Sequence, residues 1–224
     1  MMAVFENVTP ASSWTDPDLA NASYDSVSFS VSSQEASPFD CCFKDDGTKM
    51  YVVGQGSDSL YQYSLSTAWD LSAASYDSVS FDLSSQDNSP LGVFFKPDGT
   101  KFYISGNTNN TMFEYDLSTA WDISTASYST NSFSIGTQDT VPVGVFFKED
   151  GSKMFVVGLA NNSVYQYSLS TSWDVSTASY DSKSLSVASQ STGASGLFFN
   201  PDGNKAWVTG TIGDSVYQYT LSTA

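Results

Sequence analysis

A 52-residue period runs through the chain and constrains its fold more than any other feature. Four tyrosines and four glycines recur at that interval: Tyr24, Tyr76, Tyr128 and Tyr180, and Gly47, Gly99, Gly151 and Gly203. Periods of this length are typical of arrays in which each unit is one supersecondary structure that buries its faces against its neighbours. The sequence therefore predicts one repetitive domain over residues 14–224, made of four 52-residue repeats, with residues 1–13 as an N-terminal arm.

Four strands can be read in each unit, as residues 75–126 illustrate. Residues 92–96 and 101–105 are almost continuously apolar, which indicates inner strands covered on both faces. The Asp98-Gly99 pair between them supplies a tight hairpin turn. A third strand follows at 111–117, and a fourth, which alternates serine with apolar residues as at 24–31, is expected at the outer edge. We therefore expect an all-β fold, a four-bladed β-propeller of four-stranded antiparallel blades.

The ends of the array predict how the ring closes. Residues 24–31 have the pattern of a fourth strand, but they precede the first complete unit, whereas the last unit shows only three strands. We expect residues 24–31 to pair with residues 216–221, so that no sheet edge is left open.

The core of each unit resembles the YVTN-type propeller repeat, which is related to lactonase-like and NHL propellers. In the second unit the resemblance rests on Pro90, Gly92, Val93, Pro97, Asp98, Gly99, Lys101, Tyr103, Gly106 and Tyr115. It implies a propeller fold but no single function, because such propellers serve as enzymes, adhesins and cell-surface scaffolds. The Trp-Asp pairs follow the third strand, so this is not a WD40 repeat. Lactonase-like enzymes use His, Arg and Glu in their central cleft, and the first two are missing here.

The charge balance narrows the range of partners. The net charge of −16 comes from 24 acidic residues against eight lysines, with no arginine or histidine. Such a surface repels phosphate backbones and anionic lipid, so we expect no nucleic-acid partner and no membrane insertion. A cation or a neutral glycan is compatible with it. No signal peptide is visible in residues 1–10.

Polar residues recur in the loops that should gather around the central channel. They are Gln34, Gln86, Gln138 and Gln190 in one set, and Asn109, Asn110, Asn161 and Asn162 in the other. Their oxygens suit a glycan or a Ca²⁺ ion; alternatively, they satisfy the backbone of the turns. Asp40 replaces the glycine of the other repeats at the start of an inner strand, which makes it a candidate metal ligand at the channel mouth or a case of repeat drift.

Three Trp-Asp pairs recur on the opposite face: Trp69-Asp70, Trp121-Asp122 and Trp173-Asp174. Exposed, each pair could stack on a sugar ring and hold its hydroxyls, giving several weak sites and affinity through multivalency. Packed down, the indole fastens the connection between the third and fourth strands, since tryptophan usually buries most of its area.

No nucleophile, base and orienting group can be assembled from this composition, so the sequence predicts that the chain is not an enzyme. Our first hypothesis is a monomeric binding or structural module that presents polar loops to a glycan or protein, outside a cell or on a virus particle, by analogy with phage-fibre and bacterial surface propellers. One alternative is a metal-assisted, lactonase-like hydrolase with carboxylate and amide ligands in the channel. Another is a designed or excised repeat scaffold without a ligand.

Overall fold

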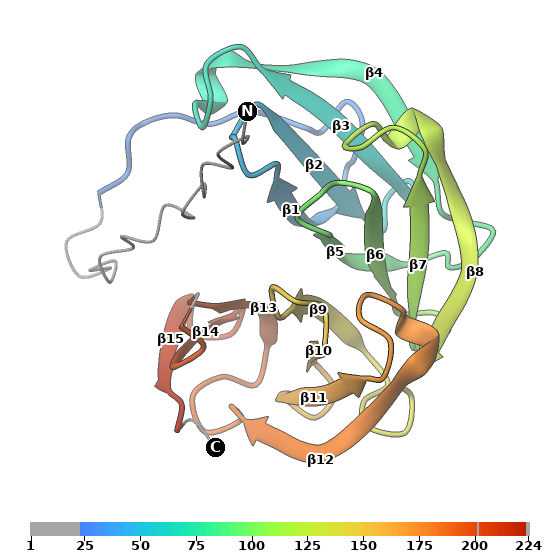
Figure 1. Cartoon of the computed structure of the whole chain (residues 1–224). Helices are drawn as coiled ribbons and strands as arrows, with labels where there is room; N and C mark the ends of the chain where they lie inside the picture. Colours follow the sequence, from blue (N-terminus) through green and yellow to red (C-terminus); the bar gives the residue numbers. More distant parts are fainter. Residues whose placement is uncertain (1–22, 201, 223–224) are drawn as a thin grey trace, which may run out of the picture.

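Four antiparallel sheets form the blades of a four-bladed β-propeller in the computed structural model, which describes residues 23–200 and 202–222 (Figure 1). The prediction of an all-β propeller with four blades is confirmed. The proposed arm at residues 1–13 lies outside the described residues. Within the described ranges, no helix is long and apolar enough to cross a membrane.

Blades 1 to 3 each contain four strands in sequence order, and blade 4 contains three. The strands are β1 (Pro38–Phe43), β2 (Lys49–Gly54), β3 (Ser59–Leu65) and β4 (Ala74–Asp82) in blade 1; β5 (Pro90–Phe95), β6 (Lys101–Gly106), β7 (Thr111–Leu117) and β8 (Ala126–Ser134) in blade 2; β9 (Pro142–Phe147), β10 (Lys153–Gly158), β11 (Ser163–Leu169) and β12 (Ala178–Ser186) in blade 3; and β13 (Ala194–Phe199), β14 (Lys205–Gly210) and β15 (Ser215–Thr220) in blade 4. One-turn 3₁₀ helices, η2 (Leu71–Ala73), η3 (Ile123–Thr125) and η4 (Val175–Thr177), precede the outer strands.

Each outer strand contains a β-bulge at the same position of the repeat. In blade 1 the register of β3 and β4 shifts between Gln62 and Tyr63. The bulge places Ser78, Thr130 and Ser182 at φ of 59°, 75° and 57°. A positive φ at a non-glycine residue is uncommon, so its recurrence marks a defined feature of the outer strand.

The hydrophobic core lies between neighbouring blades. Tyr51 and Val53 of blade 1 pack with Phe95, Phe102 and other residues of blade 2, and similar clusters join blade 2 to blade 3 and blade 3 to blade 4. Both faces of the inner strands of blades 2 and 3 are therefore covered, which explains why their sequences are continuously apolar.

The expected closure of the ring is not found, and this part of the prediction is corrected. The last sheet has the order β13-β14-β15, and residues 24–31 form no strand. These residues, which we call the leading segment, lie on blade 1, where the Phe29 ring meets the Tyr63 ring at 5.6 Å. Neighbouring inner strands are in contact from β1 through β5 and β9 to β13, but no comparable contact joins β13 back to β1. The blades form an open arc, and β15 lies across the opening from blade 1 (Figure 1).

Candidate interaction site at the open ends of the blade arc

The Trp-Asp pairs occupy the same structural position in blades 1 to 3. The three tryptophans have φ of 64° to 66°, and their indoles lie over the glycine of the Asp-Gly turn. The aspartate then caps the 3₁₀ helix: Asp70 Oδ1 accepts hydrogen bonds from the backbone N–H of Ser72 at 2.9 Å and from its hydroxyl at 2.6 Å. These bonds hold the pKa of Asp70 below its ordinary value. Each pair thus organises the loop that follows the third strand.

The preceding blade covers this loop in blades 2 and 3. The Trp121 ring stacks on the Tyr51 ring of blade 1 at 6.3 Å, and the Tyr51 hydroxyl donates to the Trp121 carbonyl at 2.6 Å. At the next junction, the Tyr103 hydroxyl of blade 2 donates the equivalent hydrogen bond to the Trp173 carbonyl at 2.7 Å. Trp121 and Trp173 are therefore packed between blades, which is the structural alternative considered from the sequence.

A second side chain from the preceding blade completes the contact. Gln62 Oε1 of blade 1 accepts a hydrogen bond from the backbone N–H of Ile123 at 3.1 Å, and Glu114 of blade 2 accepts one from Val175 at 3.0 Å. We call the loop at each Trp-Asp pair a socket and the two side chains that enter it a plug. Each junction between complete blades is thus a plug in a socket.

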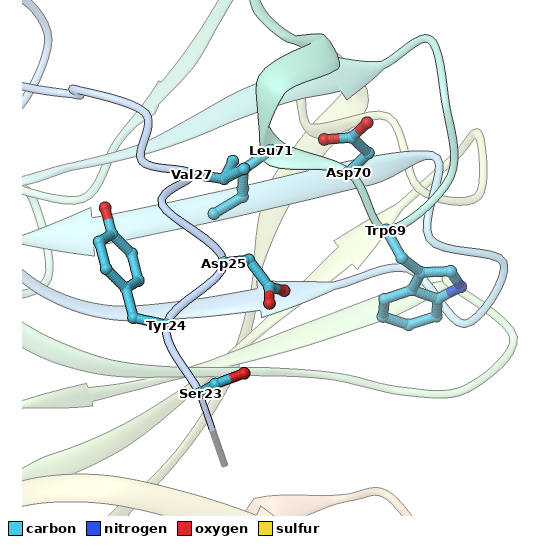
Figure 2. Close-up of a pocket in the computed structure, with 7 residues that line it drawn as sticks. All are labelled: Ser23, Tyr24, Asp25, Val27, Trp69, Asp70 and Leu71. Atoms are coloured by element: carbon cyan, nitrogen blue, oxygen red, sulfur yellow. The ribbon is translucent and has the colours of Figure 1, made fainter.

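The socket of blade 1 is open. Its Trp69 is 60% exposed, and a hollow of about 420 Å³ lies beside it. Figure 2 shows Trp69, Asp70 and Leu71 from the socket and part of the leading segment around this hollow. The lining residues are Ser23, Tyr24, Asp25, Val27, Trp69, Asp70 and Leu71. The hollow corresponds to the space that a preceding blade fills at the other sockets.

The other end of the arc exposes the complementary surface. Among the described strands, β15 pairs with β14 alone. Its Val216 is 50% exposed, whereas the residues at the same repeat position, Leu60, Met112 and Val164, are 0%, 0% and 6% exposed. Since no blade follows β15 among the described residues, apolar area that is buried elsewhere faces solvent here.

The polar loops predicted to bind ligands are bonded among themselves. Asn109 and Asn161 donate through Nδ2 to the carbonyls of Gln86 and Gln138 at 2.7 and 2.8 Å. The side-chain oxygens of Gln86, Gln138 and Gln190 in turn face the hydroxyls of Tyr115, Tyr167 and Tyr219 at 3.4, 3.4 and 3.2 Å. Asn110 and Asn162 occupy left-handed turn positions. Ligand binding by these residues stays a prediction.

The first repeat lacks one of these bonds. The hydroxyl of Tyr63, which matches Tyr115 and Tyr167, is buried without a hydrogen-bond partner among the described residues. Gln34, which occupies the position of Gln86 and Gln138, is half-buried. Buried hydroxyls are nearly always hydrogen-bonded, so the surroundings of the Tyr63 hydroxyl differ from those of Tyr115 and Tyr167.

Sequence reasoning missed a column of buried polar residues: Glu35, Asp87, Asp139 and Ser191. Asp87 is 2% exposed and accepts backbone N–H bonds from Ser89 at 2.8 Å, Thr108 at 3.1 Å and Asn109 at 2.8 Å. It therefore ties the loop before the inner strand to the turn between the second and third strands. Three acids spaced 52 residues apart were the available signal.

Asp40 lies at the junction of blades 1 and 2. Its carboxylate accepts hydrogen bonds from the backbone N–H groups of Val93 at 3.0 Å and Cys41 at 2.9 Å. Burial raises the pKa of Asp40 to about 6, despite these bonds. Within the described part of the chain, no three His, Cys, Asp or Glu side chains gather as a metal site would require. A role for Asp40 as a metal ligand stays a prediction.

Comparison with solved structures supports the propeller fold at low sequence identity. The periplasmic gluconolactonase of Pseudomonas aeruginosa superposes with a TM-score of 0.53 at 12% identity, over 83% of this chain and 50% of that one. A Bacteroides fragilis protein with a provisional assignment as a 6-phosphogluconolactonase gives 0.58 at 10% identity, over 83% and 51%. A functionally unknown protein from Desulfotomaculum acetoxidans gives 0.57 at 14% identity, over 82% and 55%. The chain thus spans about half the length of these structures. No protein-family model and no curated protein matches the sequence.

These comparisons correct one prediction from the sequence. The missing histidine and arginine led us to expect that the chain is not an enzyme, yet solved structures of the same fold include gluconolactonases. The fold therefore does not separate this chain from enzymes. The resemblance to lactonase-like propellers agrees with the structural neighbours.

Proposed function

We propose that this chain is a structural interaction module whose open blade ends bind a polypeptide partner and thereby extend the propeller. The exposure of Val216 carries the proposal, because the three residues at its repeat position are buried by the next blade. Strand β15 offers its free edge to an added strand, a common mode of polypeptide recognition. The open socket at Trp69 offers a complementary site at the other end.

A peptide that imitates an outer strand tests this proposal. The peptide has the sequence of residues 178–187 (ASYDSKSLSV), which comprise β12 and the residue after it, and is labelled with fluorescein. We expect the peptide to bind saturably to the full chain carrying Phe29→Asp, a substitution that weakens the contact of the leading segment with blade 1. Binding should be lost when Val216→Glu is added. A peptide of the same residues in scrambled order is the control. Equal binding of both peptides, or no binding, would contradict the proposal.

Lactone hydrolysis is the second candidate. A carboxyl whose pKa is about 6 can exchange a proton near neutral pH, and Asp40 has such a pKa at the junction of two inner strands. Hydrolysis of D-glucono-δ-lactone in a pH-stat, with and without Ca²⁺, tests it against Asp40→Asn. A rate that exceeds the buffer rate and falls in the variant would support catalysis.

Glycan binding at the loops and display on a cell or virus surface are further proposals that rest on the sequence. A glycan array probed with the chain and with Gln86→Ala, a substitution in those loops, tests the first of them.

A further inference from the structure

We propose that the edge of β15 selects its partner by charge and binds an extended segment of another polypeptide that carries an aspartate. In that segment the aspartate directly follows an aromatic residue and precedes a large apolar residue by four positions. Lys205 and Gln218 of blade 4 bind its carboxylate. The inference rests on the proposed function, since it names the chemistry of the polypeptide that binds at this end of the arc (Figure 1).

Blades 1 and 3 each bind such an aspartate where the outer strand joins the sheet. Asp77 of β4 accepts hydrogen bonds from Gln62 Nε2 at 2.8 Å and from Lys49 Nζ at 3.0 Å. Asp181 of β12 accepts the equivalent bonds in blade 3, at 2.7 and 2.8 Å. One carboxylate of the outer strand is thus held by the second and third strands of its own blade.

The bound aspartates are charged and partly shielded from water. Burial acts to raise the pKa of Asp77, but the hydrogen bonds that its carboxylate accepts lower that pKa below its ordinary value. The pKa of Asp181 is lowered in the same way. The Asp77 side chain is only 17% exposed, so its ion pair with Lys49 is screened less than a pair on the open surface.

Blade 2 shows that the third strand determines which strand supplies the carboxylate. Its third strand has Glu114 at the position of Gln62, and its outer strand has Ser129 at the position of Asp77. Glu114 is 0% exposed and accepts a hydrogen bond from Lys101 Nζ at 2.7 Å. A glutamine on the third strand therefore goes with an aspartate on the outer strand, and a glutamate goes with a serine.

Blade 4 has the same combination on its inner strands as blades 1 and 3. Gln218 of β15 occupies the position of Gln62, and Lys205 of β14 occupies that of Lys49. Among the described strands, this sheet has the order β13-β14-β15, without the outer strand that supplies the aspartate elsewhere. Gln218 is exposed, whereas Gln62 is 4% exposed. The edge of β15 therefore presents the two residue types that bind an aspartate in the other blades.

The Gln218 amide is already oriented to donate. Its Oε1 accepts a hydrogen bond from Trp207 Nε1 at 3.2 Å. In blade 1, Gln62 Oε1 accepts one from the backbone N–H of Ile123, while Gln62 Nε2 donates to Asp77. Since the oxygen of Gln218 is engaged in the same way, its Nε2 group is the part of the amide that can donate to an added carboxylate.

The Lys205 ammonium supplies the charge that selects the partner. An ammonium has three donors and serves several acceptors at once, as Lys49 does with Asp77 at 3.0 Å and the Ser64 hydroxyl at 3.4 Å. A positive charge at this edge favours a strand with a carboxylate at the matching position and disfavours one with an ammonium there.

The repeat also gives the register of the added strand. In blade 1, Phe81 and Tyr76 of the outer strand face an apolar residue and a tyrosine of β3. At the equivalent positions of β15, Val216 would face the large apolar residue of the partner, and Tyr219 would face its aromatic residue. Because the aspartate directly follows the aromatic residue, as Asp77 follows Tyr76, this register brings its carboxylate to the lysine and the glutamine.

Four labelled peptides test the choice of aspartate. The first has the sequence of residues 178–187, the second carries Asp181→Asn, and the third carries Asp181→Ser with Ser182→Asp, which keeps composition and net charge. By fluorescence anisotropy, we expect the first to bind the Phe29→Asp chain about tenfold more tightly than the second and third, because each of these loses a charge-assisted contact. The fourth is the control: Ser184→Asn lies at an exposed position of β12 and should bind like the first.

Substitution of the chain identifies the group that binds the aspartate. We expect Lys205→Gln to weaken binding of the first peptide about tenfold and to leave the affinity for the Asp181→Asn peptide unchanged. The unchanged affinity also shows that the variant is folded. Lys148→Gln is the matched control, because Lys148 pairs with Asp150 in a turn of blade 3, and it should change neither affinity.

Equal affinities for the first peptide and the Asp181→Asn peptide would overturn the inference, as would a Lys205→Gln chain that binds both more weakly by the same factor. In either case, loss of binding in the Val216→Glu chain would still support the proposed function, so the two failures are distinguishable. Absence of binding by every peptide would contradict both proposals.

The wild-type chain shows whether the edge of β15 is open to an outside polypeptide. We expect it to bind the first peptide with the same affinity as the Phe29→Asp chain, because the leading segment lies on blade 1. Binding by the Phe29→Asp chain alone would show that the leading segment occupies the edge of β15, and would overturn the inference.

Discussion

Single buried carboxylates hold the loops of this propeller in place. Asp87 accepts three backbone N–H bonds from two loops, and Asp139 accepts bonds from Val141, Ala160 and Asn161 in the next blade. Backbone donors at such turns have no strand partner, so a buried acceptor satisfies them where water is excluded.

Removal of the Asp87 carboxylate should therefore destabilise the fold. We expect Asp87→Ala to lower the free energy of unfolding by about 3 kcal/mol, because three buried N–H groups lose a charged acceptor. Asp82→Ala is the control: Asp82 is exposed and accepts one backbone bond, from Ser84, so the loss should stay below about 1 kcal/mol. Urea unfolding followed by fluorescence measures the free energy of unfolding of both variants. Equal losses would show that the buried hydrogen bonds to Asp87 stabilise the fold no more than an exposed one.

Asp40 should make stability depend on pH. Its pKa is raised to about 6 by burial, so the folded state holds the proton more tightly than the unfolded chain does. The resulting stabilisation is fully present below the ordinary carboxyl pKa and is lost as the pH rises through 6. Relative to Asp40→Asn, the wild-type chain should therefore lose about 2 kcal/mol between about pH 4 and about pH 8. Unfolding curves at both pH values test this, and a constant difference would contradict it.

At the scale of the element, the repeated turn and its tryptophan form one unit. Gly99 has φ of 71°, and a Cβ added there would lie 2.2 Å from the Trp121 indole. Gly203 has φ of 66° in the same turn of blade 4, but a Cβ there would meet no atom of the described residues within 4 Å. The two positions share their backbone conformation and differ in what covers them.

This difference makes a matched pair of variants. Gly203→Ala should cost about 1 kcal/mol of folding free energy, from the left-handed backbone alone. Gly99→Ala should cost about 2 kcal/mol more, because the indole must also move. Thermal and urea unfolding of both variants measure the difference in folding free energy. Equal losses would show that the Trp121 indole moves aside at no energetic cost.

The strands could be predicted because their signals are local. The apolar runs, the Asp-Gly turns and the alternation in the outer strands each specify one element, and all recur at 52 residues. The role of the Trp-Asp pairs stayed open, because burial of an indole depends on the neighbouring blade. Asp87 and its equivalents were missed for the same reason: a carboxylate in a polar loop has the same sequence pattern whether it faces water or three N–H groups.

At the scale of the whole molecule, the structure contradicts the predicted closure of the ring. The repeat gives the number of blades, but the rotation between them depends on how Tyr51, Phe95 and their equivalents pack across each junction. No local pattern encodes that rotation. The sequence therefore predicted an outer strand at residues 24–31 paired with residues 216–221, whereas residues 24–31 form no strand and lie on blade 1.

The blade junctions also differ in what seals them. Tyr51 and Tyr103 reach across the first two junctions through their hydroxyls, but Phe155 holds that position at the third and contacts Phe199 at 4.4 Å without a hydroxyl to donate. The last blade is therefore the one that denaturant should detach first, exposing a three-blade remnant before the remainder unfolds.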